Sequence, residues 1–405
     1  MYVVMISPGY PLEITYFTRA LAWAGAKVLG VSDQPESALP EETRRHLAAY
    51  LQVPSLVDED AVVEAVKRWT SPVRVDRVEC LWEPGVLLAA RLREALGVDG
   101  MTSEETLPFR DKDRMKQVLS AAGVRTPRHA RATTADECRD AARRIGFPLI
   151  LKPIAGAGSA DTYRVEDEKQ LEETLPRLEH LPEVNVEEFI EGEEFTFDTV
   201  CVGGEVAYHS ITMYRPHPLI ARTNEWVSPQ IVMLRDVEAE EYAAGCEMGR
   251  AVLGALNFKT GFTHMEWFRK RDGEVVFGEI ACRPPGARSV DVMNYASDTD
   301  LFAGWAEAVV KGQFTQKVER RYNAAIIFKR AQGQGHIYRV EGLQHLLSKY
   351  GEHIVLIDLL APGSHRRNWR QTLLSDGYLI VRHPDLQRTL EIADAVGTDL
   401  QLYAR

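Results

Sequence analysis

The sequence predicts an α/β domain at the start of the chain, followed by a larger region of α+β type. Two patterns lead to this expectation. Apolar segments of strand and helix length alternate over residues 1–105, and pairs of short apolar segments typical of hairpins follow after residue 145. The chain has 405 residues, which at roughly 100–200 residues per domain fits three domains.

Residues 1–105 contain the elements of a parallel strand–helix–strand unit. The apolar run at 2–6 indicates a buried strand, a helical spacing of apolar residues follows at 13–24, and a second strand is expected at 27–31. Short connections favour a parallel, right-handed arrangement. A helix at 60–69, a strand at 76–82 and a helix at 85–96 complete the domain. The GxGxxG fingerprint is missing here, so we expect a scaffold and substrate platform rather than a dinucleotide site.

The rest of the chain is expected to combine helices with hairpin strands. Helices are predicted at 103–122, 134–145, 167–178, 238–255 and 301–311. Strands are predicted at 147–153, 161–165, 184–190, 195–202, 205–212, 260–269 and 274–281. Residues 322–405 alternate short strands and helices, and their pattern alone does not indicate a function.

The composition is that of a globular protein with an acidic balance. Hydrophobic residues make up 45% and charged residues 26% of the chain, which is enough to bury a core. Lys and Arg number 48 against 59 Asp and Glu, for a net charge of −11. This charge argues against non-specific nucleic-acid binding, which needs a basic surface. It is compatible with one local basic pocket for a phosphate ligand.

Several absences from the sequence bear on location and partners. No run approaches the ~18–20 apolar residues of a transmembrane helix, and the N-terminus lacks the features of a signal peptide. The five cysteines are scattered without a CxxC pair, so neither a zinc site nor a disulfide framework is indicated. We therefore expect a cytoplasmic protein with reduced thiols and no membrane or nucleic-acid partner. A homodimer is compatible with the sequence.

Lys152 stands in a context that suits a phosphate ligand. It ends an apolar stretch and precedes a loop of small residues, and burying a lysine is costly unless it meets an anion. Gly156, Gly158 and Ser159 in that loop would let backbone N–H groups approach phosphate oxygens closely. The alternative is an ordinary hairpin turn with a lysine at its edge. Lys112, on a predicted helix, reads by itself as a solvated side chain.

An acidic segment follows at residues 187–194, where five glutamates are interleaved with apolar residues around Gly192. The apolar residues and the central glycine suit a hinge that offers backbone groups to a purine edge and a carboxylate to a ribose. A solvated acidic edge is the other interpretation of this pattern.

Glu266 and Glu279 lie in neighbouring predicted strands with apolar surroundings. Two carboxylates on adjacent strands repel each other unless a cation sits between them, and hard oxygen ligands point to Mg²⁺ or Mn²⁺. Arg283, four residues after Glu279, adds a fixed cation that can clamp a phosphoryl or carboxylate group. One exposed acid and one Glu–Arg ion pair would be the purely structural interpretation.

In this order the motifs resemble the ATP-grasp superfamily, and within it the L-amino-acid ligase-like branch of carboxylate–amine ligases. The matching segments are Asp111-Lys112, Gly123-Val124-Arg125-Thr126-Pro127, 147–153 with 156–159, 187–195 and 279–286. The resemblance implies an N-terminal pre-ATP-grasp α/β domain followed by the two-subdomain ATP-grasp fold. The domain would cover 1–105, the small, lid-bearing subdomain 106–192, and the large subdomain 193–405, with a C-terminal extension from about residue 320.

The resemblance also implies how ATP would be held between the two subdomains. Lys112 and Lys152 would grip the phosphates, and Gly156, Gly158 and Ser159 would belong to a flap that closes over them. Glu187 would face adenine together with the backbone of Glu188, Phe189 and Ile190, and Glu194 would face the ribose.

The metal and catalytic residues follow from the same resemblance. Glu266 and Glu279 would hold Mg²⁺ or Mn²⁺, while Arg283 and Lys152 would stabilise the transferring phosphoryl group. One position departs from the family pattern Glu-x-Asn-x-Arg, because Ala281 stands where an asparagine ligand is usual. A second metal ion would lose a side-chain oxygen there, whereas the two glutamates are still expected to bind metal.

The implied reaction joins a small-molecule carboxylate to an amine through an acyl-phosphate, with release of ADP and phosphate. Three candidate substrate residues are Arg222, Glu225 and Arg288; an arginine can bind a carboxylate bidentately. A plain surface loop and a surface ion pair are the alternatives for them. Two other functions stay open: a biotin-carboxylase-like enzyme with another acceptor, and a non-catalytic nucleotide-binding protein, which Ala281 motivates.

Overall fold

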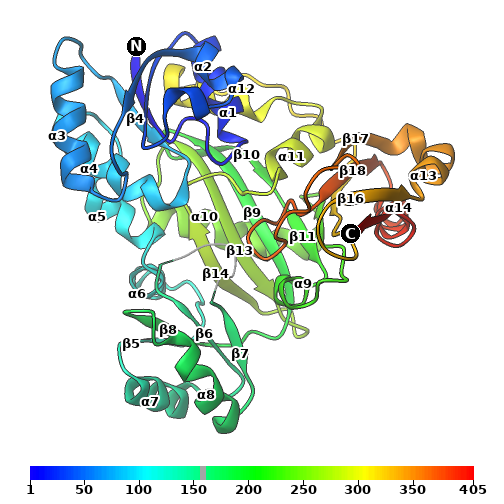
Figure 1. Cartoon of the computed structure of the whole chain (residues 1–405). Coiled ribbons are helices and arrows are strands. Elements are labelled where there is room, and N and C mark those ends of the chain that lie inside the picture. Colours follow the sequence, from blue (N-terminus) through cyan, green and yellow to red (C-terminus); the bar gives the residue numbers. More distant parts are fainter. Residues whose placement is uncertain (156–160) are drawn as a thin grey trace.

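The computed structural model describes residues 1–155 and 161–405, and it confirms the predicted order of an α/β domain followed by α+β structure (Figure 1). The N-terminal domain (blue) and the small sheet that carries helices α7 and α8 lie at opposite ends of the view, with the large sheet between them. Among the described helices, none has the length and apolar character needed to cross a membrane.

The N-terminal domain is built on a parallel sheet with the strand order β3-β2-β1-β4. Its strands are β1 (Tyr2–Ile6), β2 (Lys27–Ser32), β3 (Leu47–Gln52) and β4 (Arg77–Cys80). Its helices are α1 (Ile14–Trp23), α2 (Glu41–His46), α3 (Glu59–Thr70) and α4 (Val86–Leu96). The predicted parallel pairing of the first two strands is confirmed. Sequence analysis missed α2 and β3, because β3 is a half-exposed edge strand without the apolar pattern of a buried one.

Helices α5 (Ser103–Thr106) and α6 (Lys112–Ala121) lead into a small antiparallel sheet with the order β5-β8-β6-β7. Its strands are β5 (His129–Ala132), β6 (Leu149–Pro153), β7 (Tyr163–Val165) and β8 (Val184–Glu188). Helices α7 (Ala135–Ile145) and α8 (Glu168–Thr174) pack on it around a core of their own. Helix α7 begins at Thr134, whose hydroxyl and Glu137 form a reciprocal capping box.

A nine-stranded sheet, with antiparallel pairing throughout, forms the centre of the molecule. The strand order is β14-β13-β9-β11-β12-β15-β18-β17, and β10 pairs with β9. The strands are β9 (Glu193–Val202), β10 (Glu205–Ser210), β11 (Thr212–Arg215), β12 (Gln230–Met233), β13 (Gly261–Arg269), β14 (Val275–Ala281), β15 (Asn323–Phe328), β17 (Ile354–Leu359) and β18 (Gly377–His383). Three strands of the C-terminal region thus extend the same sheet.

Helices cover both faces of this sheet. Because side chains alternate along a strand, Ala325 and Ile327 of β15 face one core, while Ile326 and Phe328 face the other. The first core includes α10 (Glu240–Ala255), α13 (Leu343–Tyr350) and α14 (Leu386–Asp399). The second includes α11 (Ser289–Ser297), α12 (Leu301–Lys311) and α1 of the N-terminal domain. Two further features are helix α9 (Pro218–Thr223) and the antiparallel pair of β16 (Ile337–Glu341) and β19 (Gln401–Ala404), which are distant in the sequence.

Helix α10 lies unusually close to the strands that carry the predicted acids. A Cβ atom at Gly245 would lie 2.3 Å from the Trp267 ring, and one at Gly249 would lie 2.3 Å from the Phe197 ring. Trp267 is fully buried on β13, directly after Glu266. The two glycines therefore allow large aromatic side chains to anchor β9 and β13 against the helix, which gives the acids a rigid support.

Candidate active site

A cavity between the small sheet and the large sheet gathers most of the residues predicted to act on ATP. Helix α6, strands β6 and β8, the start of α9 and strands β13 and β14 all contribute to its wall. Of the predicted residues, it is lined by Lys112, Lys152, Glu187, Glu188, Phe189, Ile190, Glu194, Glu266 and Glu279. Apolar contacts from Pro127, Ile150, Leu219 and Phe268 complete it.

Buried charges form a compact cluster at one side of the cavity. Glu187 lies between two lysines, with its oxygens 2.7 Å from Lys152 Nζ and 2.9 Å from Lys116 Nζ. Burial would raise the pKa of Glu187, but the two ammonium groups lower it to about 2. Burial lowers the pKa of Lys116 to about 8. The Glu187 carboxylate is thus held by lysines, and it fixes their ammonium groups at the cavity wall.

Lys116 is a residue that the sequence analysis missed. It is fully buried, and it lies one helical turn after Lys112 on α6, so both side chains emerge on one face of the helix. The i, i+4 spacing of the two lysines was a signal in the sequence. It indicates a site because β8 places Glu187 opposite Lys116.

Glu279 connects the basic cluster to the acids of the large sheet. Its carboxylate lies 3.6 Å from Lys112 Nζ and 3.6 Å from Lys152 Nζ. Burial would raise the pKa of Glu279, but the lysines lower it to about 2, so the group is ionised. Across the β13–β14 pair, Glu266 stands directly opposite Glu279, beside an irregularity in the strand register.

The acids of the large sheet create a negative potential that suits a bound cation. Burial, together with Glu266 and Glu279, raises the pKa of Glu194 well above its ordinary value. Two carboxylates on facing strands are the donor set that Mg²⁺ or Mn²⁺ favours. Within residues 1–155 and 161–405, no group of three or more acidic, histidine or cysteine side chains is arranged around a metal position. Ala281 at the end of β14 adds no side-chain oxygen, so the residues present fit one ion held by a pair.

A chain of buried polar side chains lies behind Glu266. His264 is on the same face of β13, and its Nδ1 lies 2.6 Å from Asp198 Oδ1, while its Nε2 lies 3.5 Å from Glu266. Thr196 donates a hydrogen bond of 2.7 Å to the other Asp198 oxygen. Burial alone would lower the pKa of His264, but Asp198 and Glu266 raise it to about 10, so the ring is charged. This imidazolium orients Glu266 and offsets part of its charge.

Glu194, which is predicted to face a ribose, contacts His217. In the described part of the chain it forms no ion pair with a lysine or an arginine. Its carboxyl lies 3.1 Å from His217 Nε2. Burial lowers the pKa of His217, whereas burial, followed by Glu266 and Glu279, raises the pKa of Glu194. Both groups line the cavity and can exchange this contact for hydroxyl groups of a ligand.

Arg283 lies next to the cavity but not among the described residues that line it. Its guanidinium is bound to Glu83 of the N-terminal domain through Nε at 2.5 Å, and Glu83 also pairs with Arg110. Burial opposes the positive charge, yet Glu83, Glu279 and Glu266 raise the pKa of Arg283. Glu83 was not identified from the sequence, because its partners are distant in the chain.

The three candidate substrate residues are not gathered with the others. Among the described residues that line the cavity, Arg222, Glu225 and Arg288 are not represented. Arg222 is exposed on α9, Glu225 pairs with Arg366 at 2.8 Å, and Arg288 pairs with Asp291 at 2.9 Å. The predicted loop residues Gly156, Gly158 and Ser159 lie outside the described part of the chain.

Two sheets that close on a cavity with lysines at one side and carboxylates at the other define a clamp for a polyanion and its cation. Residues 117–290 match the family model of the ATP-grasp domain. The match assigns an ATP-grasp domain to this part of the chain.

The proteins with similar sequences include amino-acid ligases. The chain is 28% identical over 218 residues to an L-arginine-specific L-amino acid ligase of Bacillus subtilis, a match that covers 52% of each protein. It is 27% identical over 283 residues to an alanine–anticapsin ligase of Bacillus subtilis strain 168, covering 60% of this chain and 59% of that one. The aligned regions thus span about half the length of these curated relatives.

The fold as a whole is similar to that of a solved amino acid ligase. An L-amino acid ligase from Bacillus licheniformis superposes with a TM-score of 0.79 at 18% identity, covering 100% of this chain and 98% of that one. At this identity the comparison shows the fold, including the N-terminal and C-terminal regions outside the family-model match.

Proposed function

We propose that this protein is an ATP-dependent carboxylate–amine ligase that forms an amide bond through an acyl-phosphate. The observation that carries the proposal is the cavity in which Lys112 and Lys152 face the carboxylates Glu266 and Glu279. Such a site can neutralise a triphosphate from both ends, with ammonium groups on its oxygens and a cation between phosphate and protein carboxylates. The named amino-acid ligases among its relatives support the same reaction class.

The reaction would proceed in two transfers. An oxygen of the substrate carboxylate attacks the γ-phosphorus of ATP, and the bond to the bridging oxygen of ADP breaks. The amine nitrogen then attacks the acyl carbon, the C–N bond forms, the C–O bond to phosphate breaks, and the amine gives up a proton. Positioning and charge neutralisation supply most of the catalysis, because phosphoryl transfer needs little covalent chemistry from the protein.

Each residue of the cavity has a part in this proposal. Lys112 and Lys152 hold phosphate oxygens, and Arg283, which its ion pair with Glu83 holds in position, stabilises the phosphoryl group in transfer. Glu266 and Glu279 would hold Mg²⁺, which when bound neutralises charge on the phosphates. Residues Glu187 to Ile190 form the adenine wall, and Glu194 with His217 meets the ribose hydroxyls.

The substrates are proposed to be small carboxylic acids and amines, with amino acids the first class to test. Arg222, Glu225 and Arg288 remain candidate substrate residues outside the cavity. The domain boundaries at 105 and 192 are likewise proposed, and the N-terminal domain contacts the large subdomain beside the cavity through the ion pair of Glu83 with Arg283.

An assay of ADP release with pooled amino acids and carboxylic acids tests the proposal. We expect ADP formation to require added substrate and to be matched by an amide product in the mass spectrum. Nucleotide binding without substrate-dependent phosphate release would instead support a non-catalytic protein. Phosphate release that needs bicarbonate would support the biotin-carboxylase-like alternative.

A further inference from the structure

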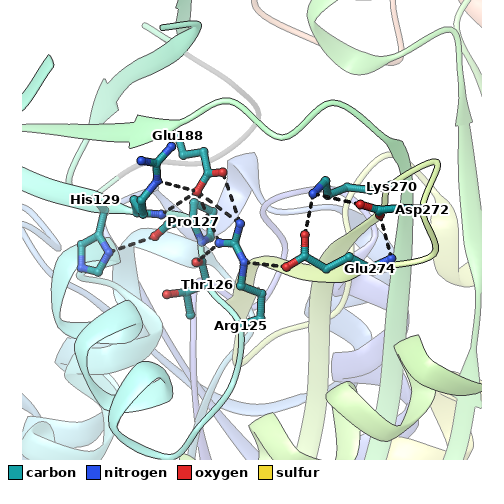
Figure 2. A network of polar contacts seen from close by, with 9 residues as sticks. Arg125, Thr126, Pro127, His129, Glu188, Lys270, Asp272 and Glu274 are labelled. Carbon is teal, nitrogen blue, oxygen red and sulfur yellow. Dashed lines mark hydrogen bonds and ion pairs between the residues drawn. The ribbon is translucent and has the colours of Figure 1, made fainter. Parts of the chain in front are cut away.

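Arg125 lies where the small sheet and the large sheet meet (Figure 2). It belongs to the connection between α6 and β5. Its guanidinium donates from Nη2 to Glu188 at 3.2 Å and from Nε to Glu274 at 3.0 Å, so it joins carboxylates that are 86 residues apart in sequence (274 − 188). Glu188 ends strand β8 and lies in the acidic hinge segment 187–194, and Glu274 stands directly before β14, the strand that carries Glu279.

Each carboxylate is also held from its other side. Glu188 accepts hydrogen bonds from the backbone N–H of Arg128 at 3.1 Å and from its side chain at 3.4 Å. Glu274 accepts from Lys270 Nζ at 2.6 Å. Lys270 and Arg125 lower the pKa of Glu274, and Arg125 and Arg128 outweigh burial to lower that of Glu188. Figure 2 shows the side chains converging on the Arg125 guanidinium from both sheets.

Backbone contacts fix the same junction. The N–H of Phe277 on β14 donates to the carbonyl of Arg125 at 2.9 Å. Gly192, in the hinge just after β8, lies so near β13 that a Cβ atom there would be 2.5 Å from the carbonyl oxygen of Arg269. The hinge and the β13–β14 hairpin therefore pack closely against each other, and the Arg125 side chain links them through ion pairs.

We infer that Arg125 is a positioning residue that sets the adenine end of the cavity at a fixed distance from its metal-binding end. Arg125 is not among the described residues that line the cavity, whereas its partner Glu188 is. A nucleotide that reaches the hinge with its base and Glu279 through a cation must span both ends at once. A protein that holds this spacing before the ligand binds loses less conformational entropy on binding. This inference rests on the proposed function, since it assumes that the cavity binds ATP with a metal ion.

Two ligands separate this role from a general structural one. The imido analogue of ATP with Mg²⁺ spans both ends, whereas ADP without metal lacks the cation that links it to Glu279. We expect Arg125→Met to weaken binding of the Mg²⁺–imido-ATP complex about tenfold, the size typical of residues that orient binding groups without touching the ligand. Binding of metal-free ADP should change by less than about twofold. Titration calorimetry measures both, and thermal unfolding shows that the variant is folded.

A double-mutant cycle identifies the contact that matters. Glu274→Gln, which removes the charge of the hairpin partner, should weaken the magnesium complex similarly, and the double variant should be no weaker than either single one. Arg125→Lys should recover only part of the affinity, because one ammonium cannot serve both carboxylates as a guanidinium does. Arg139→Met is the matched control, since Arg139 also bridges two carboxylates, Asp136 and Glu172, but away from the cavity.

The outcomes distinguish this inference from the proposed function. If Arg125→Met binds Mg²⁺–imido-ATP as tightly as the unmodified protein, or if both ligands weaken equally, the inference is overturned and the proposed function stands. Additive effects of Arg125→Met and Glu274→Gln would also overturn it. If the unmodified protein binds neither nucleotide, the proposed function is wrong, and the inference, which rests on it, is wrong as well.

Discussion

Glu279 is the residue on which both halves of the cavity depend, because it meets Lys112 and Lys152 on one side and faces Glu266 on the other. Replacing it with glutamine keeps the size of the side chain and removes its charge. We expect Glu279→Gln to lower the rate of phosphate release at least about a hundredfold, since the carboxylate that we propose to bind the metal ion, and that pairs with two lysines, loses its charge. Steady-state rates at saturating ATP measure this.

The control for that variant is Glu352→Gln, at a side chain that is 83% exposed and far in sequence from the cavity residues. It should keep the rate of the unmodified protein. Near-normal turnover in folded Glu279→Gln would show that the metal assignment is wrong.

His209 gives the protein a predicted sensitivity to acid that is independent of the active site. Burial, followed by the nearby Arg320, lowers the pKa of His209 from 6.5 to about 4. A histidine whose pKa is depressed by folding stabilises the folded state above its unfolded pKa, and this contribution is lost as the pH falls from about 6.5 to about 4. The shift corresponds to at most about 3 kcal/mol of unfolding free energy.

The variant His209→Phe keeps a ring beside Phe197, whose centroid lies 5.4 Å away, and cannot be protonated. Denaturant titrations between pH 4 and 7 should therefore show a shallower loss of stability for this variant than for the unmodified protein. His345→Phe, at an exposed histidine, is the control. Parallel pH profiles for His209→Phe and the unmodified protein would refute the assignment.

Single residues show which parts of the site could be predicted from the sequence and which could not. Lys152 and Glu187 could be predicted because each stands in a distinctive local context, and the structure brings both to the cavity. Lys116 and Glu83 could not, since their importance comes from partners far away in the chain. A charged residue in a short pattern does not indicate which distant group neutralises it. For Arg288 the sequence left a substrate contact and an ion pair open, and the structure shows an ion pair with Asp291.

At the scale of elements, the short helix α9 links the cavity to the C-terminal region. His217, Pro218 and Leu219 at its start line the cavity. Its other end is held by Arg330, whose Nη1 donates to the carbonyls of Ala221 at 2.9 Å and Asn224 at 2.8 Å. The position of this cavity wall therefore depends on a residue that follows β15.

We expect Arg330→Met to weaken binding of Mg²⁺–ATP by about three- to tenfold, because two carbonyls lose their donor and α9 becomes free to move. Limited proteolysis should cut the α9 segment faster in the variant. Arg339→Met, which removes an exposed arginine paired with Glu341, should change neither property. An unchanged dissociation constant for Arg330→Met would mean that α9 is positioned by its other contacts.

Elements with a strong periodic pattern could be predicted, and several short elements could not. Strands β6, β7 and β8 of the small sheet and the β13–β14 hairpin follow from apolar runs separated by turn residues, whereas strand β5 was not predicted. Strand β12 and helices α9 and α11 escaped prediction because they are short or because their burial comes from neighbouring elements. Sequence analysis also treated the C-terminal region as an extension, whereas pairing of β12 with β15 makes it part of the central sheet.

At the scale of the whole molecule, Glu83 joins the N-terminal domain to the cavity. It pairs with Arg110 and with Arg283, and no more than 13% of its side chain is exposed. We expect Glu83→Gln to reduce turnover more than about tenfold, because Arg283, which we propose to meet the transferring phosphoryl group, loses the carboxylate that positions it. Affinity for Mg²⁺–ATP should stay within about twofold, since Arg283 is outside the nucleotide wall.

Kinetics of phosphate release and equilibrium binding together test that separation. Glu59→Gln is the matched control, because Glu59 pairs with Arg91 wholly within the N-terminal domain. A Glu83→Gln variant that loses nucleotide affinity and turnover to the same degree would show that Glu83 supports the fold of the cavity rather than the placement of Arg283.

The central claim is that a substrate carboxylate oxygen becomes bonded to the γ-phosphorus of ATP before the amide forms. Carboxylic and amino acids labelled with ¹⁸O in the carboxyl group, supplied with unlabelled ATP, Mg²⁺ and amines, test it most directly. The account predicts that the released inorganic phosphate carries one ¹⁸O atom for each amide formed, as read by mass spectrometry. Amide formation with unlabelled phosphate, or ADP formation without any transfer of label, would contradict it.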